Sequence, residues 1–128
     1  MPDPDFVILY VENPLASTAF YAGLLGRAPV EASPTFAMFA LQTGVMLGLW
    51  SRYGVAPAVT PPAPTGSGAG GELAFTVADG AAVRTMHADW VGRGLTVIQA
   101  PTEMEFGHTF VALDPDGHRL RVFAPPPA

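Results

Sequence analysis

One order of secondary structure occurs twice along this chain, and this recurrence constrains the fold more than any other feature. In the first half, the β-branched and aromatic run at residues 6–11 predicts a strand. Asn13 and Pro14 are typical of a helix start, and Gly26 is typical of a helix end. About three further strands are expected before residue 53. The first half is therefore predicted to be strand, helix and three strands.

The second half repeats this order. Residues 72–77 predict a strand, Asp79 predicts the cap of a helix that continues to about residue 93, and residues 95–99 predict another strand. The segment at 114–117, Asp-Pro-Asp-Gly, predicts a tight turn, because proline presets φ, aspartate bonds nearby amides and glycine accepts positive φ. Its flanking arms, residues 109–113 and 118–123, complete a β-hairpin.

A duplicated βαβββ unit is the simplest description of this pattern. We therefore expect an α+β fold of two tandem modules, residues 5–53 and 72–124, joined by a proline- and glycine-rich linker at 54–71. Each module is expected to form a curved sheet with a helix on one face, and the two sheets are expected to enclose a ligand trough. With 128 residues, the chain is expected to be one domain, 1–128.

Composition narrows the possible functions. The net charge of −5 and the lack of any basic cluster argue against a nucleic-acid partner. The chain has no cysteine, which excludes disulfides, thiol nucleophiles and thiolate metal sites. No apolar run has transmembrane length, and the N-terminal Met-Pro-Asp-Pro-Asp lacks the features of a signal peptide. We expect a cytoplasmic protein with no membrane partner.

Three motifs, in this order, carry a resemblance to a known family. They are Val-Glu-Asn-Pro at 11–14 with Ser17 and Phe20-Tyr21, Gly-Glu-Leu-Ala-Phe-Thr-Val at 71–77, and the Asp-Pro-Asp-Gly turn at 114–117. With them the chain resembles the vicinal-oxygen-chelate superfamily, which includes glyoxalase I, extradiol dioxygenases, fosfomycin resistance enzymes and bleomycin-binding proteins. The resemblance covers essentially the whole chain and implies the glyoxalase/bleomycin-resistance fold.

Within that superfamily the chain looks most like the phenazine-antibiotic (griseoluteate) resistance proteins. The matching features are Leu49-Trp50-Ser51, Glu72, Phe106-Gly107 with Thr109-Phe110, and Asp-Pro-Asp-Gly-His at 114–118 followed by Arg121-Val122. This resemblance implies a binding protein and not a catalyst. It also implies a homodimer that holds a planar tricyclic antibiotic in a metal-free pocket.

The resemblance also indicates where a metal would be bound. Superfamily enzymes place four ligands on inward strand faces, and the matching positions here are Phe6, Gly48, Glu72 and Arg121. Only Glu72 offers a donor atom for a cation, since a guanidinium has no acceptor and the other two have no polar side chain. We therefore expect no metal, no cofactor and no catalytic residue.

The trough is instead expected to hold an aromatic ligand. Trp50 offers a rigid face for stacking, Gly48 would let a flat ring approach the backbone, and Arg121 could hold a carboxylate through its fork. The predicted ligand-binding residues are Phe6, Ile8, Met46, Gly48, Trp50, Tyr53, Glu72, Phe106, His108, Phe110 and Arg121.

Plainer roles stay open for several of these residues. Glu72 and Arg121 could simply neutralise each other, Phe106 and Phe110 could be packing residues, and Tyr53 could lie on the surface. His87 and His118 are expected to be surface or satisfied histidines, whereas the strand of His108 borders the trough.

Three hypotheses follow. The first is a homodimer that sequesters a planar, anionic aromatic molecule. The second is a metal-dependent lyase or dioxygenase built around Glu72, with His108 as a further ligand. The third is a domain with no small-molecule role.

Overall fold

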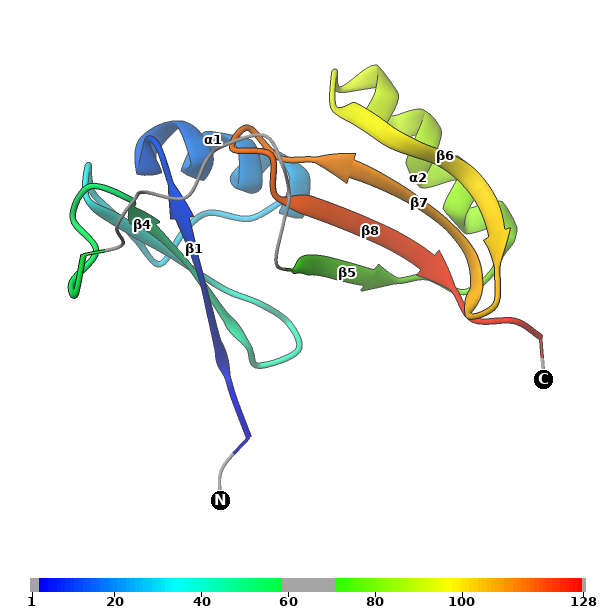
Figure 1. Cartoon of the computed structure of the whole chain (residues 1–128), viewed down its shortest axis with the longest axis horizontal. Coiled ribbons are helices and arrows are strands. Elements are labelled where there is room, and N and C mark those ends of the chain that lie inside the picture. The colour runs from blue at the N-terminus through cyan, green and yellow to red at the C-terminus, as the bar shows by residue number, and fades with distance from the viewer. Residues whose placement is uncertain (1–2, 59–70, 128) are drawn as a thin grey trace. The chain divides into compact units, whose positions relative to one another are not determined.

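The computed structural model describes residues 3–58 and 71–127, and the chain divides into two compact units, residues 1–63 and 64–128 (Figure 1). Among its described residues, each unit holds one helix and one open four-stranded mixed sheet, in the order βαβββ. This confirms the predicted α+β fold of two tandem modules. Most of the predicted linker, 54–71, lies outside the described residues, and the assignment of both modules to one domain stays a prediction.

Unit 1 contains the first five elements. They are β1 (Phe6–Val11), α1 (Pro14–Leu25), β2 (Glu31–Ala32), β3 (Phe36–Ala40) and β4 (Met46–Ser51). Helix α1 begins where the sequence predicts, because Oδ1 of Asn13 accepts hydrogen bonds from the amides of Leu15 and Ala16, at 3.1 and 3.2 Å. It ends at Gly26, whose φ of +66° suits glycine.

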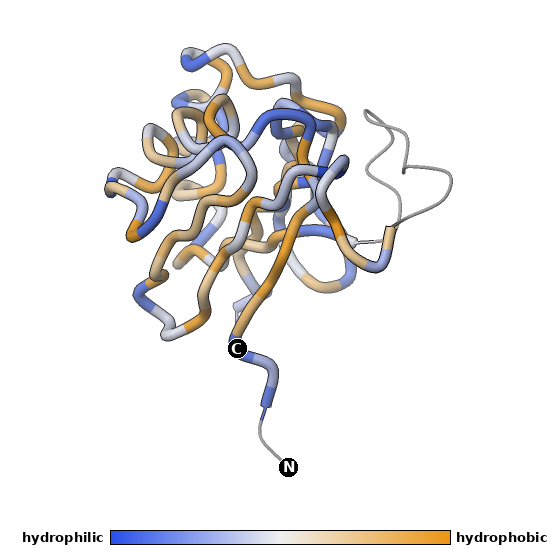
Figure 2. The backbone as a smooth tube through the Cα atoms, turned by 90° about the vertical axis from the view of Figure 1, so that its left-hand side faces the viewer, coloured by the Kyte–Doolittle hydropathy of each residue, from blue (hydrophilic) through white to orange (hydrophobic). Residues whose placement is uncertain are grey.

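The sheet of unit 1 has the strand order β1-β4-β3-β2, with β1 parallel to β4 and the other pairs antiparallel. Hydropathy rises sharply from the polar residues before β1 to the strand itself (Figure 2). Side chains alternate between the two faces of each strand. The face turned to α1 forms the core and includes Val11, Ala37, Phe39, Leu47 and Leu49, each at most 2% exposed.

Unit 2 contains the remaining five elements. They are β5 (Glu72–Thr76), α2 (Gly80–Gly92), β6 (Thr96–Met104), β7 (Gly107–Leu113) and β8 (Arg119–Ala124), with the sheet order β5-β8-β7-β6. Helix α2 covers one face of this sheet, as Figure 1 shows. Trp90 of α2 packs edge-on against Phe75 and Phe110, with ring centroids 5.5 and 5.3 Å away.

The predicted turn between β7 and β8 is confirmed. Oδ1 of Asp114 accepts hydrogen bonds from the amides of Asp116 and His118, at 2.9 and 2.8 Å, and Gly117 has a φ of +83°. This turn sets the register of the hairpin. Leu120 and Val122 are fully buried against the helix side, so the alternate residues of β8 point to the open face.

Two features of unit 2 differ from the sequence-based expectation or add to it. Strand β6 extends to Met104, beyond the predicted end at residue 99, because an edge strand tolerates Pro101 where the ladder shifts register between Gln99 and Thr102. Gly107 has a φ of +135°, and a Cβ on it would overlap the carbonyl of Ala124.

Neither α1 nor α2 is long and apolar enough to span a membrane, and the described residues contain no other helix.

Candidate functional site

The open face of the unit 1 sheet, on the side away from α1, is apolar and aromatic. Strand alternation and the registers of β1, β3 and β4 bring seven large side chains onto it. They are Phe6, Ile8, Tyr10, Phe36, Met38, Met46 and Trp50. We call this set the aromatic face. Phe6, Ile8 and Tyr10 remain 40%, 44% and 40% exposed, which is unusual for large apolar side chains on a strand.

Gly48 does let aromatic rings approach its backbone, as predicted, but these rings belong to the protein itself. A Cβ at Gly48 would lie 2.8 Å from Cε1 of Phe6 and 3.1 Å from Cζ of Phe36. These two rings therefore lean over the backbone where a ligand ring was expected. Trp50 stands beside them, half-buried, with its ring 6.4 Å from that of Phe36 and 6.5 Å from that of Tyr10, both edge-on. These side chains, and not the buried backbone of Gly48, form the surface of this face.

Tyr53 lies just after β4 and is 70% exposed. Its hydroxyl lies 2.7 Å from both carboxylate oxygens of Glu12 and donates its hydrogen to them. Nη1 of Arg52 lies 3.7 Å from the same carboxylate. The hydrogen bond to Glu12, followed by slight desolvation and the charge of that carboxylate, raises the pKa of Tyr53 above its ordinary value of 10.0. Tyr53 therefore belongs to a surface cluster and is no member of the aromatic face.

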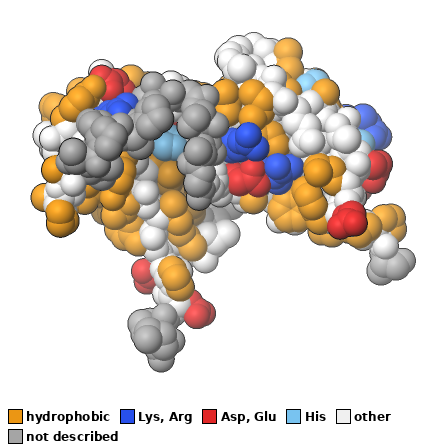
Figure 3. Space-filling model, in the orientation of Figure 1, with side chains coloured by type: hydrophobic (Ala, Val, Ile, Leu, Met, Phe, Trp, Pro, Cys, Tyr) orange, Lys and Arg blue, Asp and Glu red, His pale blue; other side chains and the backbone are white. Residues whose placement is uncertain are grey.

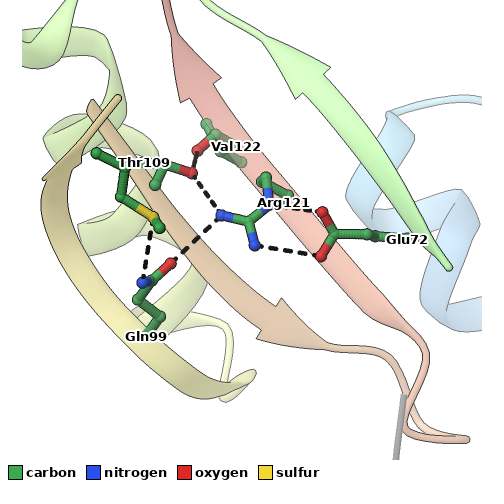
Figure 4. A network of polar contacts seen from close by, with 6 residues as sticks. Glu72, Gln99, Thr109, Arg121 and Val122 are labelled. Atoms are coloured by element: carbon green, nitrogen blue, oxygen red, sulfur yellow. Dashed lines mark hydrogen bonds and ion pairs between the residues drawn. The ribbon is translucent and has the colours of Figure 1, made fainter. Parts of the chain in front are cut away.

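Arg121 is the centre of a polar network on the open face of unit 2 (Figure 4). Its Nε and Nη2 donate to the two carboxylate oxygens of Glu72, at 2.6 and 3.3 Å. Its Nη1 donates to Oε1 of Gln99 at 3.3 Å and to the hydroxyl of Thr109 at 3.2 Å. That hydroxyl in turn donates to the backbone carbonyl of Val122 at 2.8 Å. The fork predicted to hold a ligand carboxylate is therefore already filled by Glu72.

Aromatic rings border this network. The guanidinium of Arg121 lies 5.4 Å from the ring centroid of Phe106, a cation–π distance. Phe106 is 43% exposed and packs edge-on against Phe123, with centroids 6.0 Å apart. Sequence analysis did not assign Gln99 or Thr109 to the site. Strand alternation alone places Thr109 on the same face as Arg121. The register of β6 shifts on both sides of Gln99, so alternation along β6 does not predict that Gln99 lies on this face.

Two predicted ligand contacts, Phe110 and His108, lie on the helix side of the unit 2 sheet and not on its open face. Phe110 is fully buried between Trp90 and His87, with ring centroids 5.3 Å from each, so the helix covers it. His108 lies on the same helix side, against Gly80. Side chains alternate along β7, so Thr109 between them takes the open face.

His108 instead lines a pocket of about 420 Å³ beside the start of α2, together with Asp79, Glu103 and the prolines at 125–127. Its Nδ1 lies 2.8 Å from Oε1 of Glu103, which is an ion-pair distance, but the angle makes no hydrogen bond. Its Nε2 is buried with no hydrogen-bond partner.

The residues at the superfamily's ligand positions do not fit a divalent metal. Phe6 and Gly48 offer no donor, and the carboxylate of Glu72 is engaged by the guanidinium of Arg121. Within residues 3–58 and 71–127, no group of three or more histidine, aspartate or glutamate side chains is placed to hold an ion.

Comparison with known proteins shows which family the chain is similar to. The family model described as Glyoxalase/Bleomycin resistance protein/Dioxygenase superfamily matches residues 4–122. The phenazine antibiotic resistance protein EhpR of Enterobacter agglomerans is 29% identical over 122 residues, which cover 93% of this chain and 89% of that protein.

Two solved structures are also similar. The protein ATC0852 from Agrobacterium tumefaciens has a TM-score of 0.88 and 54% identity, covering 99% of this chain and 100% of that one. A glyoxalase/bleomycin resistance protein/dioxygenase from Nocardioides has a TM-score of 0.82 and 23% identity, covering 98% and 84% of the two chains, and so supports the fold alone. Because the family model spans nearly the whole sequence, the chain belongs to the glyoxalase/bleomycin resistance protein/dioxygenase superfamily.

Proposed function

We propose that this protein binds a planar aromatic small molecule of the phenazine type, without a metal ion and without turnover, and thereby contributes to antibiotic resistance. The similarity to a phenazine antibiotic resistance protein supports this ligand class. The chemistry at the superfamily's metal positions supports binding over metal-dependent catalysis, because Glu72 already neutralises Arg121.

The observation that carries the proposal is the aromatic face of unit 1. Exposed contiguous apolar surface on a soluble protein marks a site for a ligand or a partner. Here the surface is rich in rings that can stack, and Trp50 offers the largest of them at a half-buried position. Stacking contributes about 0.5–1.5 kcal/mol beyond area burial, which corresponds to about a 2- to 10-fold gain in affinity.

We also propose that the protein is a homodimer, as the resemblance to the phenazine-antibiotic resistance proteins implies. Exposed side chains such as Val7 and Ile8 on β1 are compatible with further burial in a dimer. Light scattering coupled to gel filtration tests this directly. A mass of one chain at all concentrations would contradict it.

Tryptophan fluorescence provides the test of ligand binding, because the chain has two tryptophans in different settings. Trp50 lies on the aromatic face, whereas Trp90 is buried in the core of unit 2 and is 2% exposed. The Trp90→Phe variant therefore reports on Trp50 alone. We expect phenazine-1-carboxylate to quench it saturably and cyclohexanecarboxylate to leave it unchanged.

The matched variant is Trp50→Leu, which removes the ring but keeps an apolar side chain. Calorimetry should show about 2- to 10-fold weaker binding, equal to the stacking contribution. Saturable binding that is unaffected by the Trp50→Leu change would remove the aromatic face from the site. No binding by any member of a varied phenazine panel would overturn the proposed function.

The proposal that no metal takes part needs its own measurement. Binding should be the same with and without EDTA. Elemental analysis of protein purified without chelator decides the matter. Stoichiometric zinc, iron, manganese or nickel that is lost in Glu72→Ala would favour a metal-dependent lyase or dioxygenase instead.

A further inference from the structure

Gly48 lies in the middle of the aromatic face, at a position where a strand normally carries a side chain. It belongs to the interior strand β4, and its register partners are Ile8 of β1 and Met38 of β3. Five described glycines adopt a positive φ, but Gly48 is not one of them, so its backbone does not require glycine. A glycine inside a strand weakens the strand and often marks a close approach. The reason for glycine here is therefore the space above it.

Two aromatic rings fill this space from opposite sides. Phe6 belongs to β1 and Phe36 to β3, and these strands flank β4. A Cβ on Gly48 would lie 2.8 Å from Cε1 of Phe6, and 3.1 and 3.2 Å from Cζ and Cε1 of Phe36. The tips of both rings thus reach down to the level at which side chains leave the strand. Since strand side chains otherwise stand roughly perpendicular to the sheet, these two rings lie low on it.

The low rings set the depth of the space beside Trp50. Trp50 is the register partner of Phe36, and the two ring planes are 85° apart with centroids separated by 6.4 Å. A flat ligand that stacks on the indole therefore meets the ring of Phe36 edge-on, which is also a favourable geometry. Figure 3 shows hydrophobic side chains gathered over the strands of unit 1. How far the ligand reaches down along the indole then depends on the height of the rings at its edge.

We propose that Gly48 is a positioning residue of the ligand site, which keeps the tips of Phe6 and Phe36 low so that a flat tricyclic ligand can stack along the indole of Trp50. A bent tricyclic ligand of similar size can lie against the indole with only one of its halves. The aromatic face thereby selects flat over bent ring systems. This inference rests on the proposed function and names the shape of its ligand. All four residues belong to unit 1.

The test variant is Gly48→Ala, which adds one methyl group beneath the two rings. The backbone accepts alanine, and the nearest atom, 2.8 Å away, belongs to the far end of a side chain that can rotate. We therefore expect a folded protein in which both rings are displaced. Carbon–proton NMR spectra of the aromatic rings check this without any ligand. The signals of Phe6 and Phe36 should shift in Gly48→Ala and stay in place in the matched control Gly23→Ala, because a Cβ at Gly23 on α1 has open space around it.

Calorimetry then measures the selection for shape. It compares phenazine-1-carboxylate with thianthrene-1-carboxylate, which has the same charge and number of rings but folds about its two sulfur atoms. Wild type and Gly23→Ala should bind the flat acid about 3- to 10-fold more tightly, which lies within the contribution of one aromatic stack. Gly48→Ala should lower that preference to about 2-fold or less, mainly by weakening the binding of the flat acid.

A double-mutant comparison shows whether Gly48 acts through the two rings. In protein that carries Phe6→Ala and Phe36→Ala, no ring tip is left for a methyl group to lift. Adding Gly48→Ala to that protein should therefore change the affinity for phenazine-1-carboxylate by less than about 2-fold. A penalty that persists there would mean that the methyl group touches the ligand directly, and Gly48 would not be a positioning residue.

The outcomes separate this inference from the proposed function. If neither acid binds, the ligand class of the proposed function is wrong, and the role of Gly48 fails with it. If both acids bind equally to the wild type, or if Gly48→Ala keeps the preference, the protein binds tricyclic ligands but Gly48 does not select them. Unshifted ring signals in Gly48→Ala, or a Gly48→Ala protein that does not fold, would show that the rings do not yield as proposed, which also overturns the assignment.

Discussion

Arg121 and Glu72 form a forked ion pair across strands β5 and β8, with Nε 2.6 Å from Oε1 and Nη2 3.3 Å from Oε2. The pair is partly shielded, since the side chains are 16% and 32% exposed. It occupies positions where metal-dependent relatives would hold their ligands, according to the resemblance in sequence. Both carboxylate oxygens of Glu72 are therefore engaged by a guanidinium of the protein itself.

The first prediction concerns the stability of this pair. Glu72→Gln should destabilise the protein by about 1–2 kcal/mol, between the small value of exposed pairs and the large value of buried ones. Arg121 then keeps its charge and loses its counter-ion. Urea unfolding measures the change. Asp89→Asn breaks the more exposed pair with Arg93 and should cost less than about 0.5 kcal/mol, so an equal cost for both would contradict the prediction.

The second prediction separates two neighbouring phenylalanines. Phe110→Ala should lower the free energy of unfolding by about 3–5 kcal/mol, because the ring is fully buried against Trp90. Phe106→Ala should cost less, since that ring is 43% exposed, but it removes the cation–π contact to Arg121. Thermal melts of both variants check the order of the two stability losses, and their phenazine affinity is measured alongside. A larger loss of stability in Phe106→Ala than in Phe110→Ala would reverse the faces assigned to the two rings.

The third prediction concerns pH. The hydrogen bond that Tyr53 donates to Glu12 raises its pKa, so the folded state favours the neutral phenol. The resulting stabilisation is complete below pH 10.0, the ordinary pKa, and is lost as the pH rises through the higher folded pKa. Ultraviolet titration of phenolate should show a late-titrating tyrosine that Tyr53→Phe removes. In Glu12→Gln the pKa of Tyr53 should fall back toward its ordinary value, so the tyrosine titrates at lower pH. A titration curve that Glu12→Gln leaves unchanged would show that the hydrogen bond is absent in solution.

The fourth prediction concerns the turn that sets the open face. Asp114→Ala should destabilise the protein by about 1–3 kcal/mol, because two amides lose their acceptor at a position only 5% exposed. Asp114→Asn keeps one oxygen and should cost less. Urea unfolding of both variants tests this order. Equal stability of Asp114→Ala and wild type would mean that the turn forms without its aspartate.

Local chemistry made most of the fold predictable. Strand β1 has the bounds that its apolar run predicts, and Asn13 and Asp79 cap the two helices as their side chains suggest. The end of β6 was missed because Pro101 normally stops a strand, and only tertiary context shows that this strand lies at the edge of the described sheet.

The site was less predictable, because it depends on choices between equivalent partners. Alternation places Arg119 and Arg121 on one face, but no sequence pattern says which of them Glu72 will pair with. His108 was assigned to the trough from its strand alone, although the side chain turns toward Gly80 of α2. Neighbouring residues of a strand lie on opposite faces. The sequence therefore predicts the face of a side chain only where an alternating pattern of buried residues shows which face is the core.

Gly107 leaves no room for variation at its position. Its backbone adopts a φ of +135°, and the carbonyl of Ala124 fills the space where any side chain would begin. In a saturation library screened for properly folded protein, this codon should tolerate nothing but glycine, whereas the neighbouring codon for Phe106 should accept many replacements.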